Sequence, residues 1–149
     1  MMATSCRFDP GLSHQMKKYI DKLVKISGGE IRTPRQLDAK LKSLLPKDYL
    51  NFMSITDGLS LRISEIFSVS EFITEQTSEF KQKYLDAYGM NYKSNDWLFF
   101  ANDGMGGYYA FKNISGDKKV YYFNHEFPNY LETYKTFTHF IKKIIENQK

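Results

Sequence analysis

The stretch WLFFANDGMGGYYAF, residues 97–111, decides the fold of this chain of 149 residues. It begins with a short, continuous apolar run, Trp97 to Ala101, which indicates a buried strand. A glycine-rich turn follows over residues 102–107, and Tyr108 to Phe111 predict the returning strand. Strands joined by so short a connection pair antiparallel, because parallel strands need a crossover of a dozen or more residues.

Further strands are predicted on both sides of this hairpin. A second glycine-bearing turn, Ser115–Asp117, leads into the predicted strand Val120–Phe123. Upstream, Leu59, Leu61 and Ile63 alternate with polar residues, as on a half-buried strand. These short connections predict an antiparallel meander rather than βαβ units.

Apolar residues spaced three and four apart predict helices around the sheet. Thr33-Pro34 and Pro46 have the cap-and-proline pattern of helix starts, and Asp57-Gly58 marks a helix end. The predicted helices cover 12–26, 34–44, 46–56, 70–87 and 137–145. With no internal repeat or linker, residues 1–149 are predicted to form one α+β domain, an antiparallel sheet flanked by N-terminal, middle and C-terminal helices.

Composition removes several classes of protein. The single cysteine, Cys6, forms no internal disulfide, and no Cys/His set has metal-ligand spacing. No apolar run approaches the roughly 18 residues that span a bilayer, and residues 1–11 contain no apolar core of a secretion signal. We therefore expect a cytoplasmic protein with no metal, no cofactor and no membrane partner.

Charge is unevenly distributed around a net of +4. Residues 1–50 hold ten basic and five acidic side chains, whereas residues 51–100 hold four and seven. The lysines of the first third fall between apolar residues at helical spacing. Solvated helix faces therefore explain this charge better than a nucleic-acid site does.

Aromatic residues make up 16% of the chain. Alternation along Tyr121-Tyr122-Phe123 places successive rings on opposite faces of a strand. The tyrosines at 108, 109, 121, 122 and 130 are therefore not all expected to be buried. Exposed tyrosines that have acidic rather than basic neighbours favour a protein-binding surface over one that stacks nucleic-acid bases.

Two candidates for chemistry compete with simpler explanations. The turn at 103–107 has the glycines of a phosphate loop, but it leads into a strand instead of a helix, so a tight hairpin is favoured. His125 and Glu126 follow a strand that can approach Asp103, and the three could form an acid–base group. No nucleophile stands in a recognisable motif, so we predict no catalytic residue, and a small hydrolase remains the less favoured alternative.

In order, these segments resemble the SUKH superfamily, which includes fungal cell-wall-synthesis regulators and bacterial relatives. The resemblance covers about residues 32–146 and leaves 1–31 as an N-terminal helical extension. Its matching segments are 45–52 with Asp57-Gly58, 65–72, 97–111, 120–126 and 137–145. Asp57-Gly58 stands where Asn-Gly is usual, a mild change because aspartate tolerates the same turn.

The resemblance implies an α+β fold without an established catalytic site. Many bacterial members are thought to be immunity proteins that bind and neutralise a toxin, often a nuclease, and a regulatory scaffold in envelope or signalling pathways is the alternative. The partner-binding candidates it implies here are Trp97, Asn102, Asp103, Tyr109, His125 and Glu126. The acidic middle third would complement the basic surface of a nuclease.

Overall fold

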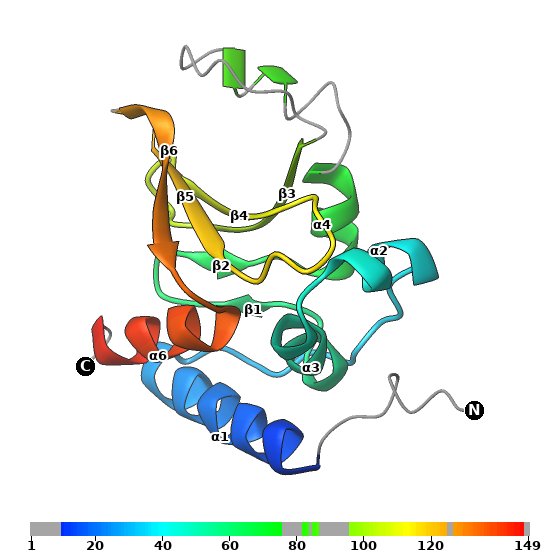
Figure 1. Cartoon of the computed structure of the whole chain (residues 1–149). Helices are drawn as coiled ribbons and strands as arrows, with labels where there is room; N and C mark the ends of the chain where they lie inside the picture. Colours follow the sequence, from blue (N-terminus) through cyan, green and yellow to red (C-terminus); the bar gives the residue numbers. More distant parts are fainter. Residues whose placement is uncertain (1–9, 76–81, 84, 87–95, 125–126, 148–149) are drawn as a thin grey trace.

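A computed structural model of the chain describes residues 10–75, 82–83, 85–86, 96–124 and 127–147 (Figure 1). It confirms the predicted α+β class, with helices packed around a six-stranded antiparallel sheet. The strands are β1 (Leu59–Ser60), β2 (Glu65–Ile66), β3 (Trp97–Asn102), β4 (Tyr108–Lys112), β5 (Val120–Asn124) and β6 (Phe127–Tyr134). The helices are α1 (Pro10–Ser27), α2 (Ala39–Leu44), α3 (Lys47–Ile55), α4 (Val69–Glu75) and α6 (Phe137–Asn147).

The strands lie side by side in sequence order, so the predicted meander of β3, β4 and β5 is confirmed. In its register Phe99 pairs with Ala110, which in turn pairs with Tyr121. The sequence reasoning missed β6, which pairs with β5 and forms one edge of the sheet. Its second residue is Pro128, which donates no ladder hydrogen bond and is therefore tolerated at an edge.

The single strand predicted over Leu59–Ile63 is wrong. The chain turns after Ser60, where the Leu61 amide donates to the Ser64 carbonyl at 2.9 Å, and β2 returns beside β1. Leu61 stays buried, but Ile63 lies in this turn and is 67% exposed. Alternation over so short a segment does not distinguish one strand from a tight hairpin.

The main core lies between the sheet and helices α1, α3 and α6, which gather on one side of it (Figure 1). Phe100 and Phe111 stack with their ring centroids 4.2 Å apart on this helix-covered face. Tyr49 of α3 meets Phe111 at 5.1 Å and Phe137 of α6 at 5.3 Å, both edge to face. The two helices therefore hold the middle of the sheet through one aromatic cluster.

The second face of the sheet is also covered, so the tyrosines are not all buried, as expected, but they are less exposed than the sequence suggested. Trp97 lies edge to face against Phe123 at 4.8 Å, and the Lys112 ammonium lies 5.2 Å from the centre of the Tyr121 ring. Tyr121 is only 3% exposed, while Tyr108, Tyr109 and Tyr122 are half-buried, and the side chain of Tyr130 falls outside the described residues. The tyrosine rings do alternate between the two faces of the sheet, but on neither face are the described rings fully exposed to solvent.

Two helices differ in extent from their predictions. The second begins at Ala39 instead of Pro34, because Asp38 supplies the cap: its Oδ1 accepts hydrogen bonds from the amides of Lys40 and Leu41 at 2.7 and 3.2 Å. The helix predicted over 70–87 begins as α4, whose described part ends at Glu75. Much of the remaining range lies outside the described residues, although 82–83 and 85–86 are helical.

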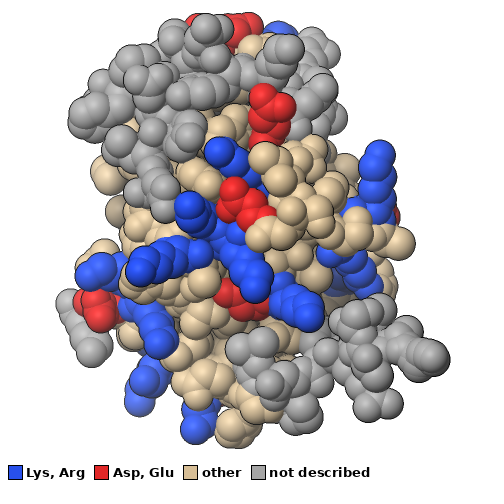
Figure 2. Space-filling view, viewed as in Figure 1, with Lys and Arg blue, Asp and Glu red and all other residues tan. Residues whose placement is uncertain are grey.

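Helix α1 divides into a core face and a lysine face. Met16, Ile20 and Leu23 are at most 1% exposed, and the helix packs on α3 and α6. Its lysines are exposed, and Figure 2 shows basic side chains spread over much of the surface in that view, with few acidic ones between them. The solvated lysine face is thus confirmed for this helix. No helix in the described part of the chain is long and apolar enough to cross a membrane.

Candidate functional site

The turn between β3 and β4 is built by its own acidic side chain. Asp103 Oδ1 accepts hydrogen bonds from the amides of Met105 and Gly107, both at 2.8 Å, and the Asp103 amide donates to the Gly107 carbonyl. Gly104 and Gly106 have φ of +77° and +92°, which glycine adopts at little cost. Amides that would face a phosphate instead bind Asp103, and β4 follows the turn, so the predicted hairpin is confirmed.

Asp103 also ties this turn to the neighbouring strand. The Tyr122 hydroxyl of β5 donates to Asp103 Oδ2 at 2.5 Å, and the Asn124 side-chain Nδ2 donates to the Tyr122 hydroxyl at 2.9 Å. A Cβ on Gly107 would lie 2.4 Å from Asp103 Oδ2, so only glycine leaves room for this contact. Burial by itself raises the pKa of Asp103, but the hydrogen bonds from Tyr122, Met105 and Gly107 outweigh it and hold the pKa below its usual value.

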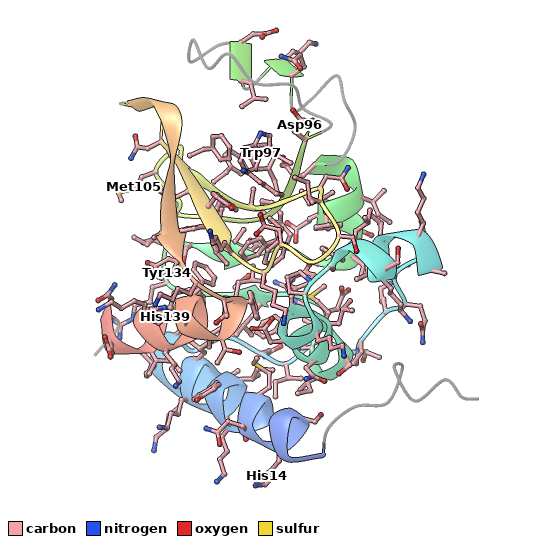
Figure 3. All side chains as sticks on the ribbon, in the orientation of Figure 1. His14, Asp96, Trp97, Met105, Tyr134 and His139 are labelled. Atoms are coloured by element: carbon pink, nitrogen blue, oxygen red, sulfur yellow. The ribbon has the colours of Figure 1, made fainter. Side chains whose placement is uncertain are left out.

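A surface groove of about 200 Å³ lies beside the turn on the helix-covered face. Its walls come from the hairpin at 61–66, the end of β3 with its turn, Tyr109 of β4, Tyr134 of β6 and the last two turns of α6. Tyr109 packs on Phe140 of α6, with ring centroids 4.7 Å apart. Figure 3 shows Met105 and Tyr134 on the same side of the molecule, above α6. Segments far apart in the sequence thus meet at this one place.

Three of the six predicted partner-binding residues line this groove: Asn102, Asp103 and Tyr109. Asn102 does so at the end of β3, although its register directs its side chain toward the second face. Trp97 starts β3 at the strand's other end, is 2% exposed and contacts Tyr121 and Phe123 on the second face. The predicted residues His125 and Glu126 lie outside the described part of the chain. The candidate site is therefore the groove with Asp103 at its rim.

Several groove residues were missed from the sequence. Ile63 and Met105 flank the groove with 67% and 69% of their surface exposed, and Ile144 and Asn147 line it from α6. The sequence did not indicate that Ile63 is exposed, because the alternation of the predicted strand placed it in the core. Ile144 falls within the apolar pattern that predicted the last helix, which gave no sign that it would line a groove.

A second polar cluster lies on the opposite face of the sheet. Glu65 pairs with Asn102, and Asn102 with Tyr108, so their side chains share the second face. The Glu65 carboxyl hydrogen-bonds to Glu71, which in turn accepts the Ser68 amide at 3.0 Å and caps α4. Burial, this hydrogen bond and the charge of Glu71 raise the pKa of Glu65 to about 7, although nearby Arg32 lowers it.

The raised pKa of Glu65 predicts a pH-dependent stability. The folded chain holds a proton on Glu65 that the unfolded chain releases above its ordinary pKa of 4.5, so this stabilisation is complete below 4.5 and is lost as pH rises through about 7. Glu65→Gln is therefore expected to be about 0.5–1 kcal/mol more stable than the wild type at pH 8, a small effect because water screens this partly exposed pair, and nearly neutral at pH 4.5. Urea unfolding at both pH values measures this; a difference independent of pH would contradict it.

Among the described residues, no group of three or more His, Cys, Asp or Glu side chains is arranged to hold a metal ion. His14 and His139 are both exposed, and Figure 3 shows them on different helices. The chemistry that the groove offers is therefore that of a carboxylate, tyrosine hydroxyls and apolar walls.

A comparison with protein families matches residues 26–143 to the SMI1 / KNR4 family (SUKH-1). The chain belongs to this family. The SUKH resemblance drawn from the sequence is thereby confirmed, and the matched range includes all six strands and most of α6. A comparison with curated proteins found no match.

The structure also explains the Asp57-Gly58 pair of this SMI1/KNR4 member. Buried Asp57 accepts the Val69 amide at 2.7 Å and so fixes the start of α4. Gly58 has φ of +70°, and a Cβ there would lie 2.6 Å from the Ile66 carbonyl oxygen. Aspartate, like asparagine, supplies the acceptor oxygen, and the pair joins the end of α3 to β2 and α4.

Proposed function

We propose that this SMI1/KNR4 member is a non-enzymatic protein-binding domain, an immunity protein that binds a cognate toxin of the nuclease type and blocks it by occlusion. The observation that carries the proposal is the groove, where exposed Ile63 and Met105 flank an ionised carboxylate, Asp103. Apolar side chains around a few fixed polar groups are typical of protein interfaces. Membership of the family is consistent with a toxin-immunity or a regulatory role.

The bonding of Asp103 supports binding over catalysis. Both of its oxygens accept hydrogen bonds from the turn or from Tyr122, and its pKa is lowered. A general acid or base works best with a pKa near the operating pH, and Asp103 is shifted away from it. The hydrolase alternative also needs His125 and Glu126, which are outside the described residues.

Charge supports a nuclease as the class of toxin. A nuclease binds phosphates through lysine and arginine side chains, so an inhibitor that covers its active site meets a basic surface. Asp103 offers the complementary charge at the groove, whereas the lysine face of α1 would repel such a partner. The proposed contact is therefore confined to the groove side, in a cytoplasmic protein that meets its toxin inside the cell.

Co-expression with the product of a neighbouring toxin gene tests this proposal. The wild type is expected to restore growth and to bind the toxin, while Asp103→Lys weakens binding at least tenfold and loses protection. Asp21→Lys makes the same charge change on the exposed side of α1 and is expected to protect fully. Circular dichroism establishes that both variants fold.

Two outcomes would overturn the proposal. Full protection by the folded Asp103→Lys variant would place the contact elsewhere. Failure of the wild type to bind or inhibit the toxin, together with a bound partner from an envelope or signalling pathway, would favour the regulatory scaffold instead.

A further inference from the structure

The groove has the walls of a site for a long, flexible side chain. Leu61, Ile66 and Ile144 supply aliphatic surface. The rings of Tyr109 and Tyr134 both pack on Phe140, with centroids 4.7 and 5.5 Å from it. At about 200 Å³ the groove is smaller than the roughly 300–1,000 Å³ of pockets for drug-sized ligands. It therefore suits one side chain of a partner protein better than a free metabolite.

Charge specifies the kind of side chain. Asp103 keeps its carboxylate ionised at the rim, and none of the described residues that line the groove is a lysine, arginine or histidine. This is notable in a chain with 21 lysines and arginines. In the described part of the chain, the groups that hydrogen-bond to this carboxylate are neutral amides and a hydroxyl. A cation supplied by a partner would therefore balance its negative charge.

The last helix, α6, also contributes negative charge to the groove. The C-terminal turn of α6 reaches the groove through Ile144 and Asn147, and the C-terminal end of a helix carries partial negative charge. Glu65 also lines the groove, but its carboxyl is hydrogen-bonded to Glu71. One carboxylate, a helix C-terminus and two tyrosine rings thus converge on a groove with apolar walls.

We propose that the groove receives an arginine side chain of the partner protein. Its methylene groups pack on the aliphatic wall, and its planar guanidinium binds Asp103 and stacks on the tyrosine rings, which a compact lysine ammonium does less well. This inference rests on the proposed protein-binding function and adds the anchor residue by which the partner is recognised.

Nuclear magnetic resonance titration of the full ¹⁵N-labelled chain tests the groove without any toxin. The probes are N-acetyl-arginine methylamide, its lysine counterpart and the neutral isostere N-acetyl-citrulline methylamide. Saturable shifts are expected at the amides of Asp103, Gly104, Gly107 and Ile144, with arginine binding at least tenfold more tightly than citrulline and more tightly than lysine. Asp103→Asn, which keeps an acceptor for the turn amides, is expected to weaken arginine binding about tenfold, and Asp21→Asn to leave it unchanged.

The inference would be overturned if arginine and citrulline bound equally well or if lysine bound more tightly than arginine. Shifts that centre outside the groove, or an Asp103→Asn variant that binds arginine normally, would overturn it too. These results are independent of toxin protection. A chain that protects against its toxin but does not prefer arginine would retain the proposed function and lose the arginine anchor. A chain that prefers arginine but does not protect would lose the immunity role instead.

Discussion

Replacing Phe100 with alanine is expected to lower the free energy of unfolding by about 3–5 kcal/mol, because the truncated ring leaves a cavity at the centre of the core. Phe100 is fully buried, stacks on Phe111 and lies edge to face against Phe137 and Phe140. Phe111 belongs to β4, and Phe137 and Phe140 belong to α6, so these rings are held by separate elements and can close little of the space. Urea unfolding followed by circular dichroism measures the loss.

Ile114→Ala is the matched control for Phe100→Ala. Ile114 is 57% exposed in the turn between β4 and β5, and its truncation is expected to change stability by less than about 0.5 kcal/mol. A Phe100→Ala variant no less stable than this control would mean that the aromatic cluster does not hold α6 on the sheet.

Replacing Leu23 with alanine is expected to cost about 2–5 kcal/mol, although Leu23 precedes the range matched to the family. Its side chain is fully buried where α1 packs on α3 and α6. The result tests whether α1 belongs to the cooperative unit or is an extension that the rest of the fold does without. Unfolding followed by both circular dichroism and Trp97 fluorescence gives the answer, since one transition by both probes indicates one unit.

Lys22→Ala provides the comparison, because Lys22 is exposed on the same helix and alanine favours helix at least as well as lysine. It is expected to change stability by less than about 0.5 kcal/mol. If Leu23→Ala cost no more than Lys22→Ala, α1 would be a dispensable extension.

The fold was predictable where local chemistry determined it. Glycines between two apolar runs predicted the β3–β4 hairpin, and Phe137 to Ile145 predicted the last helix. Prediction failed where two local signals compete. Thr33-Pro34 has the pattern of a helix start, but the helix begins later, where the Asp38 side chain caps it. Pro128 obscured β6, because a proline is typical of a strand only when that strand lies at an edge, which the sequence does not reveal.

The site was predictable only around its turn. Asp103 and Tyr109 were binding candidates because the family resemblance places its contact face at this turn and at the strand ends. The remaining wall comes from Ile63, Tyr134 and Ile144, which approach the turn through sheet register and helix packing. Such contacts depend on the complete tertiary arrangement and leave no local pattern in the sequence.

The place of α6 in the core has a consequence for synthesis. Phe137 and Phe140 cover Phe52 and Phe100, yet they follow every strand in the chain. A ribosome therefore completes the sheet before the residues that cover it leave the exit tunnel, and the aromatic face stays open meanwhile. Open apolar surface on an incomplete chain promotes aggregation and recruits chaperones. A product shortened before Phe137 would accordingly be a substrate for quality control instead of a weakened binder.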